Sequence, residues 1–526
     1  MILQSRGATA LAQAVKSLYS QGQTDYSLDP LVLVDGAGSP LGRIRDGDTV
    51  IFCCRRGERE VELTEAFTET GFRHFPRPDL QHLNFIPLTL YHEKFKDLPV
   101  AFAPTMILET LGETVSRAGL RQLHISESEK FAHVTFFFNG GNNHPFPGEQ
   151  DICIPSPKGV PFEQVPELSL PQVVEQVKCA VHEKYDLIVT NFANGDVIGH
   201  TFNTDAKLKC ASLLDSHLGQ VLDTAQRAGY VTLITADHGN LEEMVNPDGT
   251  PNGAHTCNLV PFIVVDPAAS NTTFPRSGKL ADVAPTVLSA LGIHQPPAMQ
   301  GETLIPDFNW GGRRQVLLII LDGWGLGRQD CTNPIFLAST PVWDALLENY
   351  PHSQLKAAGD AVGLQAGKTG NSEAGHMNIG AGRVILQDDV RLDRAMSDGS
   401  FFTNPVFLQA MDAVKKNGSC LHLLGLLTEK SSHGSIHYPL ALLKMACDHG
   451  LENIFLHIIF DGRSTEPGSA PALLEKLEHQ IDEIGVGQVV TGIGRGIALD
   501  RDGNYARIQR AFDALVSGAG KACPLD

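Results

Sequence analysis

The sequence predicts an α/β protein built on mainly parallel sheets, because apolar runs alternate with segments of helical spacing. Five apolar runs end in polar residues, at 185–196 (YDLIVTNFANGD), 230–240 (YVTLITADHGN), 315–325 (QVLLIILDGWG), 421–433 (LHLLGLLTEKSSH) and 453–463 (NIFLHIIFDGR). Strands that are buried on both faces of a parallel sheet read as continuous apolar runs of this kind. The length of 526 residues leaves room for two or three domains.

Polar residues close these runs. They are Asp196, Asp237, Asp322, His433 and Arg463. Ligands of open α/β sheets bind outside the carboxyl ends of the strands. We therefore expect the functional site among these side chains.

Helices are expected between the strands. The segment 339–350 (STPVWDALLENY) has a recognisable helix start, because Ser339 or Thr340 can cap it and Pro341 suits its first position. Residues 1–22 have amphipathic helical spacing with polar residues throughout, which does not match a secretory signal peptide.

The composition argues against several classes of partner. Sixty acidic and 41 basic residues give a formal net charge of −19, which repels nucleic acid and anionic membranes. No apolar run reaches the length of a membrane span. The ten cysteines are scattered without a Cys-x-x-Cys pair, so neither a disulfide framework nor a thiolate zinc site is indicated. We expect a cytoplasmic protein that gathers arginines wherever it binds an anion.

The stretch 367–376 (GKTGNSEAGH) raises the question of a nucleotide-binding loop. Such a loop needs four residues between its first glycine and the Gly-Lys-Thr, but only three separate Gly363 from Gly367. Attention therefore shifts to Ser372, whose glycine neighbours allow close approach to the backbone. As an alternative, Ser372 is a helix N-cap, and a helix N-terminus would also favour a phosphoryl group on it.

Carboxylates and imidazoles recur after the apolar runs. They are Asp196 and His200 in NGDVIGH, Asp237 and His238 in TADHGN, His255 in GAHTCN, and Asp322 in DGWG. One such pair alone is more often a surface or capping pair than a ligand set, so the repetition carries the prediction. Mixed oxygen and nitrogen ligands suit Mn²⁺ or Zn²⁺ better than Ca²⁺. A metal-activated serine at 372 would make this a phosphoryl-transfer site.

These motifs resemble a known family. GNSEAGHMNIGAGR (370–383), with DGWG, ANGDVIGHT, ITADHGN and SEKFAHVTFFFNGG (128–141), is similar to the cofactor-independent phosphoglycerate mutases of the alkaline phosphatase superfamily. The resemblance implies interconversion of 3-phosphoglycerate and 2-phosphoglycerate in glycolysis or gluconeogenesis, through a phosphoserine and without 2,3-bisphosphoglycerate. It also implies two divalent metal ions, which we expect to be Mn²⁺, and a monomer whose partner is the small-molecule substrate.

The order of the motifs resembles a circularly permuted member of that family. The segment from about Gln315 is similar to the family's N-terminal part, and residues 1 to about 305 are similar to what normally follows. The resemblance implies a phosphatase-like metal and phosphoserine domain at 105–386, with a mainly parallel central sheet. An α/β transferase-like substrate domain would comprise 1–104 and 387–526. Linkers are expected at 102–105 and at 306–314, where the usual termini would meet.

The resemblance assigns roles residue by residue. It implies one metal held by Asp196, His200 and His255, and a second held by Asp322, Asp237, His238 and Ser372. Substrate-handling groups fall at His433, Arg463, Arg495, Arg501, Arg56, Arg59 and Lys130, with His433 as the proton-transfer group. Guanidinium clusters suit bidentate binding of carboxylate and phosphate. As an alternative, RRGERE and GRGIALDR are solvated surface segments.

Departures from the family pattern cluster in the transferase-like half. The family's DGRD reads DGRS, so Ser464 replaces an aspartate, and His-Ser-His reads His433-Gly434-Ser435. The family's Asn-Phe-Arg-Pro-Asp-Arg reads CRRGER at 54–59. These changes keep two alternatives open. One is a metal-dependent phosphatase or a mutase acting on another phosphorylated acid, and the other is a metal-bound binding module.

Overall fold

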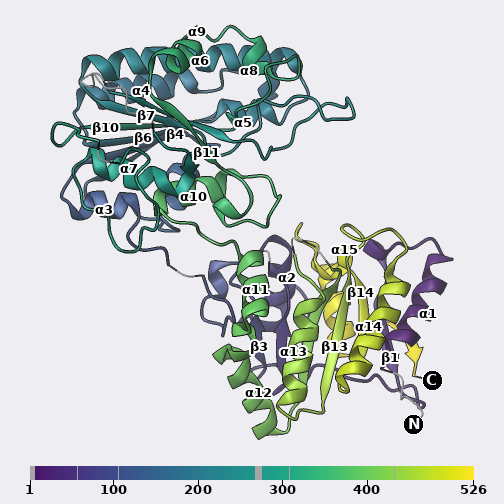
Figure 1. The fold of residues 1–526 in the computed structure, drawn as a ribbon. Helices are drawn as coiled ribbons and strands as arrows, with labels where there is room; N and C mark the ends of the chain where they lie inside the picture. Colours follow the sequence, from purple (N-terminus) through teal and green to yellow (C-terminus); the bar gives the residue numbers. More distant parts are fainter. Residues whose placement is uncertain are drawn as a thin grey trace. The chain divides into compact units, whose positions relative to one another are not determined.

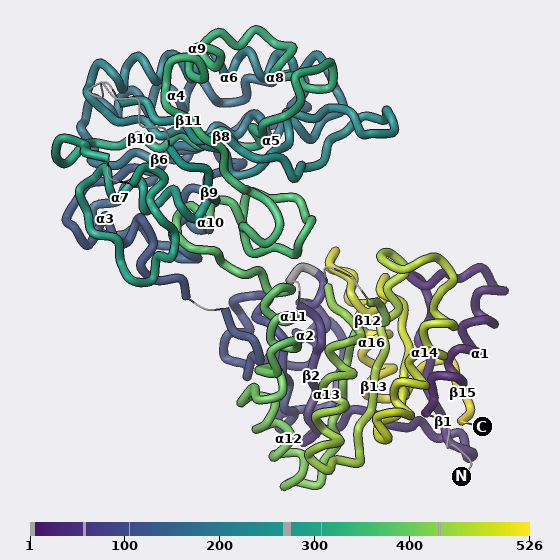
Figure 2. Tube along the Cα trace, in the orientation of Figure 1, coloured from purple at the N-terminus to yellow at the C-terminus, as the bar shows by residue number. Residues whose placement is uncertain are grey.

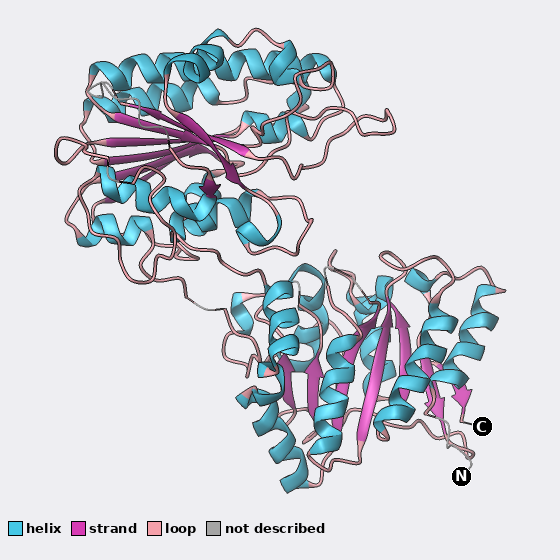
Figure 3. Ribbon diagram, viewed as in Figure 1, coloured by secondary structure: helices cyan, strands magenta, loops and turns pink. Residues whose placement is uncertain are grey.

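The structure is a computed structural model that describes residues 6–55, 57–104, 106–266, 275–306, 308–429, 431 and 433–525. The chain folds into two compact units (Figure 1). One unit comprises Met1–Pro104 and Arg391–Asp526, and the other comprises Thr105–Val390. Each unit is a central sheet with helices on both faces (Figure 3). The predicted α/β class with two mainly parallel sheets is confirmed.

The sheet of the Thr105–Val390 unit has eight strands. Their order is β5 (Glu149–Ile154), β4 (Gln122–Glu127), β6 (Leu187–Phe192), β10 (Val316–Leu321), β7 (Val231–Thr235), β8 (Val260–Val265), β11 (His352–Lys356) and β9 (Gly278–Lys279). Only β8 runs antiparallel to its neighbours. Three of the predicted apolar runs form β6, β10 and β7, which are adjacent and fully buried. Their carboxyl ends therefore meet at one edge.

Helices cover both faces of this sheet. One layer holds α4 (Leu170–His182), α5 (Asn194–Gly199), α6 (Thr204–Arg227), α8 (Pro334–Leu337) and α9 (Pro341–Asn349) (Figure 1). The other holds α3 (Leu111–Arg117), α7 (Val283–Ala290) and α10 (Ser372–Ala381). Helix α9 begins at Pro341 as predicted, with Thr340 in the N-cap position. Short helical turns are η3 (His133–Phe137), η4 (Phe162–Gln164), η5 (Leu280–Asp282) and η6 (Gly359–Val362).

The other unit has a seven-stranded sheet that both ends of the chain build together (Figure 2). Its order is β15 (Lys521–Pro524), β1 (Leu31–Val34), β14 (Gln488–Gly494), β13 (Ile454–Phe460), β12 (Leu421–Leu427), β2 (Thr49–Phe52) and β3 (Asn84–Pro87). The pair β1 and β14 is antiparallel, and the other pairs are parallel. The remaining predicted apolar runs form β12 and β13.

Two apolar cores lie on the two faces of that sheet. One is covered by α1 (Ala8–Tyr19), α11 (Asp388–Asp398), α12 (Pro405–Asn417), α13 (His437–Asp448) and α14 (Ala470–Ile484). The other is covered by α2 (Gly57–Thr68), α15 (Arg495–Ala498) and α16 (Tyr505–Val516). Shorter turns are η1 (Asp25–Ser27), η2 (Glu93–Phe95) and η7 (Ser400–Thr403). Across the described residues, no helix is both long and apolar enough to span a bilayer.

Candidate metal centre

The central strands of the Thr105–Val390 unit deliver the predicted metal ligands to one edge of the sheet. Asp196 follows β6 on α5, Asp322 follows β10, and Asp237 with His238 follows β7. His200 ends α5, and His255 lies in the loop before β8. Ser372 opens α10. The strand order, with β10 between β6 and β7, is what brings these residues together.

Glycines beside these ligands allow the backbones to approach closely. A Cβ added at Gly195 would lie 2.4 Å from the carbonyl oxygen of Asp322, and one at Gly375 would lie 2.6 Å from that of Asp237. Gly323 also has a positive φ of 71°. The glycines of NGD, DGWG and SEAG are therefore required by the packing of the three loops.

Asp196, His200 and His255 form one donor cluster. Asp196 Oδ1 lies 3.0 Å from His255 Nε2 and 3.3 Å from His200 Nε2, and the two Nε2 atoms are 3.1 Å apart. Each Nδ1 lies 2.8 Å from a backbone carbonyl, that of Gly253 for His200 and that of Gly370 for His255. Because those carbonyls accept the Nδ1 protons, the neutral form of each ring would turn its Nε2 lone pair toward the carboxylate, where a cation can replace the Nε2 protons. This donor set fits a divalent cation.

Asp237, His238, Asp322 and Ser372 form a second, fully buried cluster. His238 Nε2 lies 2.9 Å from Ser372 Oγ, 3.4 Å from Asp322 Oδ1 and 3.5 Å from Asp237 Oδ2. Among the described residues, the buried Asp237 Oδ2 accepts no well-directed hydrogen bond, and His376 Nδ1, whose proton points to the carbonyl of Ser372, lies 3.2 Å away. A buried carboxylate oxygen without a donor is costly unless a cation neutralises it. These residues therefore also fit a divalent cation.

His376 lies beside the second cluster but has no lone pair to offer a cation. Its Nδ1 donates to the carbonyl of Ser372 at 2.9 Å, and its Nε2 accepts from Asn191 Nδ2 at 3.0 Å. The same amide donates to Asp322 Oδ2 at 2.6 Å. His376 and Asn191 thus fix the start of α10 and the carboxylate of Asp322.

Lys130 lies between the two clusters. Its ammonium donates to Asp196 Oδ2 at 2.6 Å, to Asp322 Oδ1 at 3.0 Å and to Ser372 Oγ at 2.5 Å. Burial works against its charge, but Asp322 and Asp196 raise the pKa of Lys130 above its ordinary value. The lysine therefore stays cationic and neutralises part of the carboxylate charge.

Asp196 and Asp237 stay ionised despite burial, because neighbouring positive charges lower the pKa of each carboxyl. Hydrogen bonds from His200 and His255 and the charge of Lys130 hold the pKa of Asp196 well below its usual range. His238, also against the cost of burial, has its pKa raised to about 9 by Asp237 and Asp322. The field at Ser372 Oγ is therefore set by fixed charges of both signs.

Ser372 is not the N-cap of its helix, and that alternative reading is wrong. The N-cap is Asn371, whose Oδ1 accepts the backbone N–H of Ala374 at 2.8 Å. The hydroxyl of Ser372 instead contacts Lys130 Nζ, His238 Nε2 and Asp322 Oδ1. Its Oγ donates to Asp322 Oδ1 at 3.3 Å.

Two family models match the chain. The Metalloenzyme superfamily model matches residues 51–295. The model described as the BPG-independent PGAM N-terminus (iPGM_N) matches residues 1–93 and 392–525. The chain is therefore similar to metalloenzymes over much of the Thr105–Val390 unit and to the phosphoglycerate mutase N-terminus over most of the other unit.

The curated relatives described next are phosphoglycerate mutases. The 2,3-bisphosphoglycerate-independent phosphoglycerate mutase of Moorella thermoacetica is 44% identical over 299 residues, which cover 57% of this chain and 58% of the relative. That of Syntrophotalea carbinolica is 45% identical over 297 residues, covering 56% and 57%. The matched part thus spans less than two thirds of these relatives. A phosphoglycerate mutase structure from Leishmania mexicana at low cobalt concentration aligns with a TM-score of 0.40 and 27% identity, covering 51% of this chain and 52% of that one.

The other unit gathers part of the predicted substrate-handling set. Arg495 is buried and ion-paired with Asp461 at the end of β13, and Arg59 Nη1 donates to the carbonyl of Leu499 at 3.1 Å. His433 Nδ1 lies 2.9 Å from Glu60 Oε1. Arg59 and Glu60 are buried, so the reading of RRGERE as a solvated helix start is wrong for these two residues.

The remaining predicted residues lie elsewhere. Arg463 and Arg501 are exposed on loops, and Arg56 lies outside the described residues. Ser464 is also exposed, and its Oγ donates to Ser431 Oγ at 3.4 Å. Lys130 instead forms ion pairs with Asp196 and Asp322 of the two donor clusters.

Sequence reasoning missed several polar residues of both units. Glu60 and Asp461 hold His433 and Arg495, while Asn191 holds Asp322. A signal existed for Asn191, because an amide interrupts the apolar run LIVTNF, and for Asp461, which directly follows such a run. Glu60 could not be singled out from sequence, because it lies in the charged run RRGERE.

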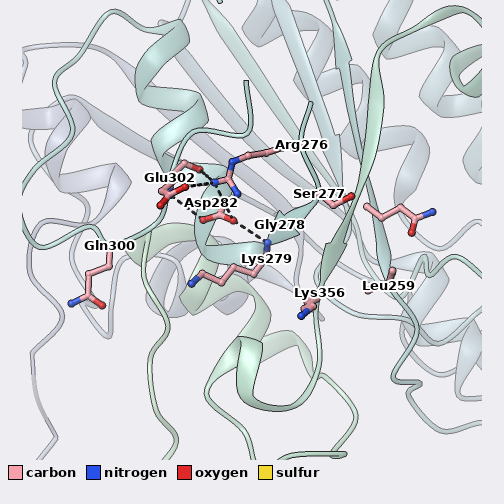
Figure 4. A pocket seen from close by; sticks show the side chains of 10 residues that line it. Leu259, Arg276, Ser277, Gly278, Lys279, Asp282, Gln300, Glu302 and Lys356 are labelled. Carbon is pink, nitrogen blue, oxygen red and sulfur yellow. Dashed lines mark hydrogen bonds and ion pairs between the residues drawn. The ribbon is translucent and has the colours of Figure 1, made fainter. Parts of the chain in front are cut away.

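A cavity of about 390 Å³ at the β9 and β11 edge is separate from these residues (Figure 4). Arg276 points into an acidic pair there, with its Nη2 3.3 Å from Glu302 and 3.7 Å from Asp282. Asp282 also accepts the backbone N–H groups of Lys279 and Glu302. These contacts tie the loops together, and none of the predicted site residues lines the cavity.

Proposed function

We propose that this protein interconverts 3-phosphoglycerate and 2-phosphoglycerate through a phosphoserine at Ser372, without 2,3-bisphosphoglycerate. The proposal rests on the three side chains that surround the hydroxyl of Ser372. Ser372 Oγ lies within 3.3 Å of Lys130 Nζ, His238 Nε2 and Asp322 Oδ1. The name of the curated relatives supports the choice of substrate.

Two divalent cations would be held by the two clusters. Asp196, His200 and His255 would bind one, and Asp237, His238, Asp322 and Ser372 would bind the other. The mixed oxygen and nitrogen donors suit Mn²⁺ or Zn²⁺, and the resemblance favours Mn²⁺. When bound, such cations lower the pKa of a coordinated hydroxyl and neutralise charge on a phosphoryl group.

Lys130 and helix α10 would act on the same phosphoryl group. The ammonium of Lys130 already donates to Ser372 Oγ, so it stabilises the developing alkoxide and later the bridging oxygen of the phosphoserine. Ser372 is the first residue of a ten-residue helix, whose N-terminal N–H groups and dipole favour an anion.

The unit formed by Met1–Pro104 and Arg391–Asp526 would handle the glycerate. Arg59, Arg463, Arg495 and Arg501, with Arg56, would bind the carboxylate and phosphate as planar guanidinium donors. His433 would move the proton between the two hydroxyls of glycerate, while Glu60 holds its ring. We accordingly assign 105–386 as the metal and phosphoserine domain, and 1–104 with 387–526 as the substrate domain.

A circularly permuted chain order is part of the proposal. The iPGM_N model matches both ends of the chain, and these ends share one sheet in which β2 pairs with β12. Two segments far apart in sequence thus build what one family model describes. A monomeric state, a cytoplasmic location and a place in glycolysis rest on the resemblance and on the composition.

Ser464 favours a second candidate, a metal-dependent phosphatase. In place of the family's aspartate, this exposed hydroxyl contacts Ser431 and supplies no carboxylate. If the glycerate is poorly retained, water completes the reaction of the phosphoserine.

One product analysis separates these candidates. The protein is incubated with Mn²⁺ and 3-phosphoglycerate, quenched over time, and assayed for 2-phosphoglycerate, glycerate, phosphate and unchanged substrate. Serine-dependent 2-phosphoglycerate supports the mutase, and serine-dependent glycerate with phosphate supports the phosphatase. Full turnover by Ser372→Ala would refute both.

A further inference from the structure

A cluster of side chains that could ligate a metal ion lies at the edge of the seven-stranded sheet opposite to His433. Asp48 precedes β2, Cys420 precedes β12, and His422 is the second residue of β12. The parallel register of β2 and β12 pairs Thr49 with Leu421, so the amino ends of both strands are level. His433 instead follows the carboxyl end of β12, so the cluster is not part of the proposed substrate site.

The three donor atoms are close enough for one cation. A carboxylate oxygen of Asp48, Sγ of Cys420 and a ring nitrogen of His422 all lie within 4.8 Å of one another. His422 Nε2 is 3.2 Å from Asp48 Oδ2. Tetrahedral zinc, with bonds of about 2.0–2.3 Å, separates its ligand atoms by roughly 3.3–3.7 Å. The nitrogen and oxygen therefore already stand near the required spacing.

A second layer of hydrogen bonds holds the donors in place. Asp48 accepts the backbone N–H groups of Arg45 and Cys420, each at 2.9 Å. His422 Nδ1 lies 2.9 Å from Nε2 of the buried His457, whose Nδ1 lies 2.8 Å from Thr491 Oγ1. With His422 Nε2 on a metal, each Nδ1 would donate along this chain to Thr491. Metal-bound histidines are commonly oriented by such a partner.

The cluster also has an entrance. A cavity of about 590 Å³ is lined by Asp48 and Cys420 and by Arg43, Arg45 and Phe455. A cation bound by three protein ligands would keep a fourth position toward this cavity, as in open zinc sites.

We propose that Asp48, Cys420 and His422 form a binding site for a divalent transition metal of the zinc class. Its sulfur ligand separates it from the centre around Ser372, whose clusters contain only oxygen and nitrogen donors. Sulfur and imidazole together favour Zn²⁺ and Co²⁺ over Mn²⁺. The alternative is a metal-free polar chain in which the protons run from Thr491 through His457 and His422 to Asp48.

Cobalt titration of the protein tests the site, because a thiolate bound to Co²⁺ has a near-ultraviolet charge-transfer absorption that oxygen and nitrogen ligands lack. Wild type should develop this band with one equivalent of sulfur-bound cobalt. Cys420→Ser should lose it, while the d–d absorption from the cobalt at the other centre remains. Zn²⁺ should abolish the band by competition.

The matched control is Cys257→Ser, because Cys257 is exposed and stands two residues from His255. Its band should equal that of wild type. Absence of the band from wild type, its persistence in Cys420→Ser, or its loss in Cys257→Ser would overturn the proposal. Circular dichroism and thermal unfolding without metal verify that each variant is folded, and Cys420→Ala replaces Cys420→Ser if the serine variant is not.

Discussion

The carboxyl group of Glu60 lies 2.9 Å from Nδ1 of His433, and both side chains are buried. The two residues are 373 positions apart in the sequence. Burial raises the pKa of Glu60, while its contact with His433 works in the opposite direction. Glu60 therefore fixes the ring of His433 and leaves Nε2 directed away from the carboxylate.

Replacing Glu60 should impair proton transfer. In Glu60→Gln the amide keeps the shape of the side chain but loses its charge, so we expect kcat to fall by roughly 10²-fold, as for loss of general acid–base assistance. The acid limb of the pH profile of kcat should also move to lower pH, because the negative charge beside His433 is lost. Glu62→Gln is the control, because Glu62 lies on the same helix and accepts from the backbone of Gly503 instead. Equal rates for the two variants would contradict the role.

Ser464→Asp should raise the ratio of mutase to phosphatase products. The aspartate would restore an acid–base group beside Asp461, whose Oδ2 accepts the backbone N–H of residue 464 at 2.9 Å. The ratio of 2-phosphoglycerate to free phosphate is measured after incubation with 3-phosphoglycerate. Thr465→Asp adds the same charge one residue away and should leave the ratio unchanged. An unchanged ratio in Ser464→Asp would show that Ser464 is not limiting.

Gly375→Ala should displace helix α10. The new Cβ would lie 2.6 Å from the carbonyl oxygen of Asp237, so the helix that carries Ser372 must move. Overpacking of this kind costs about 1–3 kcal/mol of folding free energy, so we expect a lower melting temperature. Turnover should fall by more than the loss of stability alone explains, because Ser372 moves with the helix. Gly36→Ala is the control, because nothing lies within 4 Å of its added Cβ. A variant with wild-type turnover would contradict the tight packing.

Asn191→Leu should destabilise the metal-free protein. The amide donates to Asp322 Oδ2 and to His376 Nε2, so its loss leaves buried acceptors without a donor, at a cost of about 1–3 kcal/mol. Urea unfolding in the presence of a chelator measures the change. Thr190→Val is the matched control on the same strand, because the buried Thr190 Oγ1 has no hydrogen-bond partner among the described residues. Equal losses of unfolding free energy in the two variants would show that the hydrogen bonds of Asn191 do not stabilise the protein.

Rearranging the chain into the order that the proposed permutation implies for the family should preserve the fold. The rearranged chain would join residue 525 to residue 6 through a flexible linker and open between Gly311 and Gly312, which are exposed. Helix α1, which begins two residues after residue 6, already packs against β15, where Lys521 Nζ donates to Ser17 Oγ, so the joined ends lie in the same unit. Circular dichroism and a cooperative melt within a few degrees of wild type are expected. A chain without cooperative unfolding would show that the present order is required.

The sequence by itself determined the α/β class and the strands. The periodicity of apolar runs reports burial on both faces, and β6, β7, β10, β12 and β13 appear where the runs predict them. The donor residues after β6, β7 and β10 could also be chosen from sequence, because the carboxyl ends of parallel strands meet at one edge. Their roles as ligands, and the domain assignments, stay predictions.

Only the tertiary structure decided which side chains meet. It placed Lys130 among Asp196, Asp322 and Ser372, Glu60 beside His433, and Asp48 beside Cys420 and His422. It also left Arg463 exposed while Arg495 became buried against Asp461. The physical reason is that local spacing records whether a segment is buried, whereas contacts between distant residues depend on the order of strands in the sheet.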